Sequence, residues 1–149
     1  MSIDRAMIIS IMIYNESGLL AYEARFERCE INSDLVSGFV TAIHQFGCEL
    51  FPNNSLCDIV FSNTHMFIEP RQVGGKKLTF LVIHDIYDDQ KEIAAIVDAL
   101  FAEVEEKYAK YLRENFIDSS KLAPLNDFIV KLFAKLKRKE NPFACSIDD

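Results

Sequence analysis

The chain opens with a run of apolar residues that has no polar face. Residues 6–14 read AMIISIMIY, and the segment NESG follows at positions 15–18. In residues 20–26 the apolar side chains fall on alternate positions, which is typical of a strand with one buried face. The NESG segment contains the residue types that favour a tight turn. This pattern predicts a β-hairpin at the start of a globular domain.

The same apolar run does not fit a membrane segment. A membrane-spanning helix needs about 20 apolar residues, and this run ends at Tyr14. A secretory signal has basic residues before its apolar stretch and small residues after it, whereas this run lies between Asp4-Arg5 and Asn15-Glu16. We therefore expect a cytoplasmic protein, with a peripheral position at membranes left open.

A first helix is predicted over residues 34–50, where apolar side chains recur every three or four positions. Asn32 or Ser33 can cap its start, and Pro52 ends it. We expect the apolar stripe to face the sheet and the opposite face to be solvated. The stripe contains Leu35, Phe39, Ala42, Ile43, Phe46 and Leu50, and the opposite face contains Ser37, Thr41, Gln45 and Glu49.

Three further strands are predicted in the middle of the chain. Residues 56–61 and 65–69 have strand composition, and Pro70 is expected to close the second of them. Residues 72–76 contain two glycines and predict a turn, and residues 78–84 are almost continuously apolar.

Two helices are predicted in the last third of the chain. Asp88-Asp89 can cap the first of them, whose apolar stripe extends to about Asn115. Ser119-Ser120 and Pro124 precede the second, an amphipathic helix that we expect to end at Asn141-Pro142. The predicted units are a domain over residues 1–117, a packed amphipathic helix over 118–140 and a flexible tail over 141–149.

These elements predict an α+β fold with a five-stranded antiparallel sheet. The strands at residues 6–14 and 78–83 lack a polar face, so we expect them at the centre of the sheet with helices covering both surfaces. The strands that carry Glu23, Arg25 and Asp58 tolerate solvent and suit the edges.

Composition narrows the function classes. The chain has 149 residues, a net charge of −7 and a calculated pI near 5.0, which argues against binding to nucleic acid because that binding needs basic residues. Its four cysteines are spaced too irregularly for a zinc site, and we expect them to be reduced.

Candidate catalytic chemistry is sparse, and we expect no enzyme activity, no cofactor and no metal site. His44, His65 and His84 do not form a ligand motif, and His44 has the stronger claim to a structural role than to a ligand role. The segment GGKK at 74–77 fits a hairpin turn better than a phosphate loop. Gly38, inside a predicted helix, indicates close approach either to the sheet or to a partner helix.

The basic end of the last predicted helix has two interpretations. It is either a solvated end that complements the helix dipole or, with nearby phenylalanines, a contact for a membrane surface or an acidic partner. The basic residues are Lys131, Lys135, Lys137, Arg138 and Lys139, and the phenylalanines are Phe128, Phe133 and Phe143.

The segments IYNESGLLAYEARF and DLVSGFVTAIHQFGCEL, with this order of elements, resemble the longin family, in particular stand-alone archaeal longin or roadblock-like proteins. The likeness covers about residues 5–117, and the strand-first start favours longin over roadblock. The resemblance implies the strand order 2-1-5-4-3, with the first helix on one face and the later helices on the other. It also implies an adaptor module for membrane traffic or small-GTPase control. Such modules dimerise through the first helix and third strand, here 34–50 and 56–61.

The first hypothesis is therefore a non-catalytic interaction module that forms a homo- or heterodimer and binds a small GTPase, another longin or roadblock protein, or a trafficking complex. The alternatives are a small ligand-binding, sensor-like domain and a peripheral membrane adaptor. The predicted partner-binding residues are Ser37, Gly38, Thr41, His44, Gln45, Cys48, Asp58 and Val60.

Overall fold

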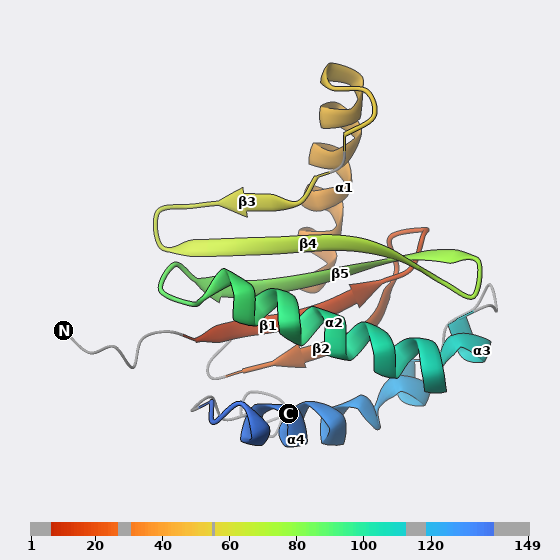
Figure 1. The fold of residues 1–149 in the computed structure, drawn as a ribbon. Helices are drawn as coiled ribbons and strands as arrows, with labels where there is room; N and C mark the ends of the chain where they lie inside the picture. The colour runs from red at the N-terminus through yellow and green to blue at the C-terminus, as the bar shows by residue number, and fades with distance from the viewer. Residues whose placement is uncertain (1–6, 27–30, 55, 113–118, 139–149) are drawn as a thin grey trace.

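The computed structural model describes residues 7–26, 31–54, 56–112 and 119–138 (Figure 1). This part of the chain contains one five-stranded antiparallel sheet in the order β2-β1-β5-β4-β3, together with four α-helices and one short 3-10 helix. The predicted α+β class and the strand order are confirmed. The strands are β1 (Ile8–Tyr14), β2 (Leu20–Arg25), β3 (Asp58–Val60), β4 (Thr64–Val73) and β5 (Lys76–Asp85); the helices are α1 (Ser33–Leu50), α2 (Gln90–Lys107), α3 (Ala109–Leu112), η2 (Ser119–Leu122) and α4 (Leu125–Lys135).

The N-terminal hairpin forms as predicted. The side chain of Asn15 accepts hydrogen bonds from the backbone N–H groups of Ser17 and Leu19, and Gly18 takes a left-handed backbone conformation with φ of 84°. These contacts close the turn between β1 and β2. The two apolar strands, β1 and β5, lie inside the sheet, and the polar strands β2 and β3 form its edges, as expected.

The hairpin between β4 and β5 has longer strands and a shorter turn than predicted, because Gln72, Val73 and Lys76 belong to the strands. Its turn is made by Gly74 and Gly75, both with positive φ, as expected for a two-residue turn. Pro70 does not close β4, which continues to Val73 with Pro70 opposite Thr79. Because β3 pairs only with residues 65–67, this end of β4 lies at the sheet edge in the described structure, where a missing N–H disrupts no ladder. β3 is also shorter than the predicted 56–61.

The predicted ends of the later helices are wrong. α2 ends at Lys107, and α3 follows after a break at Tyr108, so no single helix runs on to residue 112; residues 113–118 lie outside the described residues. α4 ends at Lys135 because Lys137 adopts φ of 57° and the N–H of Arg138 donates to the carbonyl of Phe133. The expected stop at 141–142 lies outside the described residues.

The buried side chains form two clusters of unequal size. Ile11 and Ile13 of β1 belong to the larger cluster, whereas Met12 and Tyr14 belong to the smaller, because successive side chains of a strand point to opposite sides. α1 contributes one buried residue, Val40, to the smaller cluster. The helical members of the larger cluster are Ile93, Ile96, Val97, Leu100, Val104, Tyr108, Leu122, Leu125, Ile129 and Phe133.

Candidate functional site

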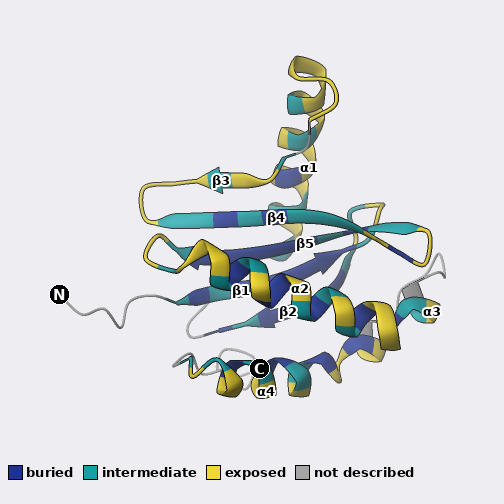
Figure 2. Cartoon of the chain, in the orientation of Figure 1, coloured by how far each residue is buried: buried dark blue, intermediate teal, exposed yellow. Residues whose placement is uncertain are grey.

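α1 carries an apolar surface that nothing in the described chain covers, and we call it the α1 stripe. The side chain of Asn32 caps the helix by accepting from the N–H groups of Asp34 and Leu35, so of the two candidate caps Asn32 is the one used. The expectation that the apolar side chains face the sheet is wrong, because these side chains are exposed, and much of α1 has the colour of exposed residues in Figure 2. The exposed fractions of the stripe residues are Leu35 67%, Phe39 42%, Ile43 37%, Phe46 61% and Leu50 56%.

The rotation of α1 follows from the contacts of its first turns. The hydroxyl of Tyr14 donates to the carbonyl of Ser33 at 2.8 Å, and the hydroxyl of Ser37 donates to the carbonyl of Gly18 at 2.6 Å. Burial raises the pKa of Tyr14, which keeps its hydroxyl protonated and able to donate. Together with the burial of Val40, these contacts fix which side of α1 meets the sheet. The stripe is left facing away, and the C-terminal turns of α1 extend beyond the edge strand β3 (Figure 1).

Four of the predicted partner-binding residues lie together on the opposite flank of α1. Ser37, Thr41, His44 and Gln45 line a pocket of about 220 Å³ between α1 and the sheet. We call its buried lining residues Tyr14, Val40 and Ile68 the floor, which is mainly apolar; the exposed lining residues Glu16, Thr41 and Gln45 are polar. The remaining lining residues are Tyr14, Asn15, Glu16, Gly18, Val40, Leu56, Ile68, Pro70, Lys77 and Thr79.

The other predicted partner-binding residues are spread over α1 and β3. Gly38 is exposed, and a Cβ placed on it would meet no atom within 4 Å, so its expected close approach to the sheet is wrong. Cys48 is exposed one turn after His44. Asp58 pairs with His65 across the β3–β4 ladder, whereas Val60 is 65% exposed. The structure therefore divides these residues between two flanks of α1 and the edge strand.

Two histidines that are distant in sequence lie side by side in the sheet. His65 of β4 is opposite His84 of β5, and their ring centroids are 5.0 Å apart. His84 is buried; its Nδ1 donates to the carbonyl of Asp85 at 2.8 Å, and burial lowers its pKa. Only the β4–β5 register reveals this pair. Within the described residues, no group of three or more His, Cys, Asp or Glu side chains has metal-binding geometry.

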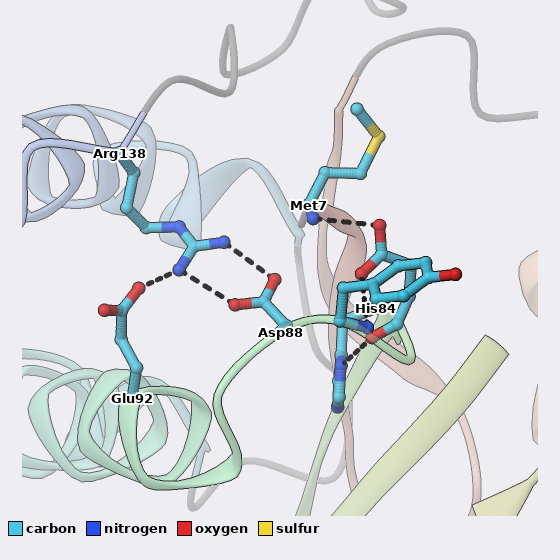
Figure 3. Close-up of polar contacts among 7 residues, drawn as sticks. Met7, His84, Asp88, Glu92 and Arg138 are labelled. Atoms are coloured by element: carbon cyan, nitrogen blue, oxygen red, sulfur yellow. Dashed lines mark hydrogen bonds and ion pairs between the residues drawn. The ribbon is translucent and has the colours of Figure 1, made fainter. Parts of the chain in front are cut away.

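The basic end of α4 is partly buried in an ion-pair cluster. Arg138 contacts the carboxylates of Asp88 and Glu92, with Nη2 at 2.9 Å from Oδ2 of Asp88 (Figure 3). The side chains of Arg138 and Asp88 are only 6% and 4% exposed. The interpretation of a wholly solvated basic end is therefore wrong for Arg138, although it holds for Lys131, Lys135 and Lys137, which are exposed. Lys139 and Phe143 lie outside the described residues.

Comparison with known proteins does not assign this chain to a family. No protein-family model matches the chain, and no curated protein matches its sequence with significance. Among the helices of the described residues, none combines the length and the apolar content needed to cross a bilayer.

Proposed function

We propose that this chain is a non-catalytic protein-interaction module that forms a homodimer through the α1 stripe. The observation that carries the proposal is that five large apolar side chains are exposed along one face of a single helix. Their combined exposed area is on the order of 500 Å², since one large side chain offers roughly 200 Å². Contiguous apolar patches above a few hundred Å² typically mark interaction sites.

A second copy of the chain fits this surface. The stripe contains no charged residue, so two copies related by a two-fold axis can face each other without burying like charges. A stable interface needs about 800 Å² from each partner. The stripe supplies the apolar core of such an interface, and the rest of α1 can supply its rim.

Gly38 adds a further argument for a partner helix. It lies one residue before Phe39 of the stripe, is exposed and has open space where a side chain would begin. A glycine inside a helix lowers helix stability by roughly 0.5–1 kcal/mol relative to alanine. Close approach of a second helix gives this glycine a use that the chain alone does not provide.

The wider role that we propose is that of a longin-type adaptor that binds or regulates a small GTPase or a trafficking complex. The strand order supports it, because it is the order that the resemblance implies. The two clusters also support the longin arrangement, since Val40 of α1 packs in one and the buried residues of α2 and α4 pack in the other. Binding of purified small GTPases, loaded with GDP or GTP, to the immobilised chain tests this role; no binding in either state contradicts it.

Dimerisation is tested by placing a charge in the stripe. We expect Phe46→Glu to weaken self-association at least tenfold, because a buried charge without a partner is strongly unfavourable. The matched control is Val130→Glu, which places the same charge at an exposed apolar position of α4, 46% exposed. Light scattering at micromolar concentration measures the masses. A wild-type monomer, or equal loss in both variants, contradicts the proposal.

A second variant separates the two flanks of α1. Gln45 is exposed on the flank that lines the pocket. Gln45→Glu is therefore expected to leave the association constant unchanged. If instead Gln45→Glu weakens association and Phe46→Glu does not, the partner docks on the flank that contains Ser37, Thr41 and His44.

The pocket supports a second candidate function, a small ligand-binding domain. At about 220 Å³ it is smaller than most ligand sites, but it combines an apolar floor with polar side chains from α1, the β1–β2 turn and β5. A fragment screen by protein-observed NMR tests it, with Thr41→Trp as the variant that fills the pocket mouth. Shifts confined to pocket residues, and lost in Thr41→Trp, would favour this candidate.

The membrane-adaptor alternative has less support. Phe133 is 2% exposed and stacks on Phe26, with ring centroids 5.3 Å apart, and Phe128 packs against the larger cluster. Of the three phenylalanines proposed as membrane anchors, Phe133 therefore belongs to the core and Phe128 is partly buried against it.

A further inference from the structure

His44 and Cys48 form a close pair of metal-ligating side chains on successive turns of α1. Nε2 of His44 lies 3.6 Å from Sγ of Cys48, and the residues are four apart, so both project from the same flank of the helix. Cys48 is exposed and His44 partly exposed. The pair lies in the C-terminal half of α1, and His44 is also one of the residues that line the pocket between α1 and the sheet.

The separation of the two atoms fits zinc ligands. In a tetrahedral site, Zn–S bonds of about 2.3 Å and Zn–N bonds of about 2.0–2.1 Å place the sulfur and nitrogen roughly 3.6 Å apart. The other polar contact of Cys48 Sγ is the carbonyl of Asn54 at 3.7 Å, which is long and weak. A zinc ion can therefore bind both atoms with little movement of either side chain.

We propose that His44 and Cys48 are half of a zinc site that the same pair of a second copy completes. No third ligand among the described residues joins them, so the described part of one chain supplies two of the four ligands that a structural zinc ion takes. Two chains related by a two-fold axis supply two imidazole nitrogens and two thiolates. Each thiol releases its proton to solvent as the zinc–sulfur bond forms, so zinc binding weakens in acid.

This site is separate from the α1 stripe. At 3.6 residues per turn, His44 and Cys48 lie on the side of α1 away from Phe39 and Phe46. A zinc ion shared by this pair therefore joins chains through a second contact. Zinc is expected to link two stripe dimers of the wild type, or two monomers of a variant such as Phe46→Glu whose stripe no longer associates. The two contacts can be tested independently.

The experiment is a zinc titration of the metal-free chain, carried out on the wild type and on Phe46→Glu. We expect half a zinc ion per chain by calorimetry and a doubling of the mass by light scattering in both proteins. Cobalt in place of zinc is expected to give a thiolate-to-metal charge-transfer band. His44→Ala and Cys48→Ser are expected to lose the mass doubling and the band, whereas the controls His65→Asn and Cys57→Ser retain them.

Two results would overturn the zinc site: one zinc ion per chain without a change in mass, or binding that survives in Cys48→Ser. A separate result would contradict the dimer that we propose for the stripe. If the wild type and Phe46→Glu have the same mass in chelator, the proposed dimer is wrong, whatever the zinc titration gives.

Discussion

α1 and α2 have the same length and opposite relations to the core. Each has 18 residues, and each is capped by an Asx side chain, Asn32 for α1 and Asp89 for α2. α2 buries five residues, whereas α1 buries only Val40. α1 exposes five large apolar side chains, and no residue of α2 is among the exposed large apolar residues of the described chain.

The contrast extends to what holds each helix in place. α2 packs with α4 in the larger cluster, and its first turn is joined to the end of α4 by the Arg138 ion pairs. α1 is held by Val40 and by the hydrogen bonds of Tyr14 and Ser37. The apolar face of α2 is therefore buried in the core, whereas the apolar face of α1 is exposed in the described structure. Substitutions in α2 should therefore change mainly the free energy of unfolding, whereas substitutions in the α1 stripe should change mainly self-association.

The largest expected effect is a loss of stability from the core side. Leu100 of α2 is fully buried, so Leu100→Ala is expected to lower the free energy of unfolding by about 3–5 kcal/mol. Phe46→Ala in the α1 stripe is expected to change it by less than about 0.5 kcal/mol, as at an exposed site. Urea denaturation below the association range measures both. Equal losses would show that α1 is as much a part of the core as α2.

The next effect concerns the ion pairs between α2 and α4. Arg138→Met leaves the buried carboxylate of Asp88 without its cation, and we expect a loss of about 3 kcal/mol. The double variant with Asp88→Asn removes the uncompensated charge and is expected to recover part of that loss. If Arg138→Met lowers the free energy of unfolding by less than about 1 kcal/mol, Arg138 behaves as a solvent-exposed cation.

The sequence predicts those features of the structure that a local pattern of residues determines by itself. Strands without a polar face have to lie inside the sheet, and β1 and β5 do. Turn chemistry is equally local, as at Asn15 and Gly74-Gly75. Asn32 and Asp89 cap their helices for the same reason.

The candidate site was less predictable, because apolar periodicity shows that a face avoids water but not what covers it. The stripe of α1 has the spacing of a core-facing helix, and it is turned outward by the burial of Val40 and the contacts of Tyr14 and Ser37. The pairing of His65 with His84 requires the sheet register. The position of Arg138 beside Asp88 requires the path of the chain between α2 and α4.

A smaller effect on the free energy of unfolding is expected from a change of pH, through His84 on the side of the sheet that faces α2. Burial lowers the pKa of His84 below its ordinary value of 6.5, and the nearby ring of His65 lowers it further, while Asp85 and Asp88 oppose the shift. The unfolded chain therefore binds a proton at higher pH than the folded chain does. The free energy of unfolding should fall as pH decreases below about 6.5. Thermal melts from pH 7.5 to 5.5 measure this, and His84→Asn should reduce the slope; equal slopes would exclude His84 as its source.

The smallest effect is expected at Gly38, where one substitution tests both the stability of the monomer and its association. Because no atom lies within 4 Å of a Cβ at Gly38, Gly38→Ala is expected to stabilise the monomer by about 0.4–1 kcal/mol through the lower entropy of the unfolded chain. If a partner helix approaches the backbone at this position, the added methyl group should weaken association while the monomer becomes more stable. Gly47→Ala, also with open space around its Cβ, adjoins Phe46 of the stripe and tests the approach of a partner helix nearer the end of α1. Denaturation of dilute protein and light scattering at high concentration measure the two quantities. Unchanged association in Gly38→Ala would move the partner helix away from Gly38, and a destabilised monomer would show that this glycine serves the fold of the single chain.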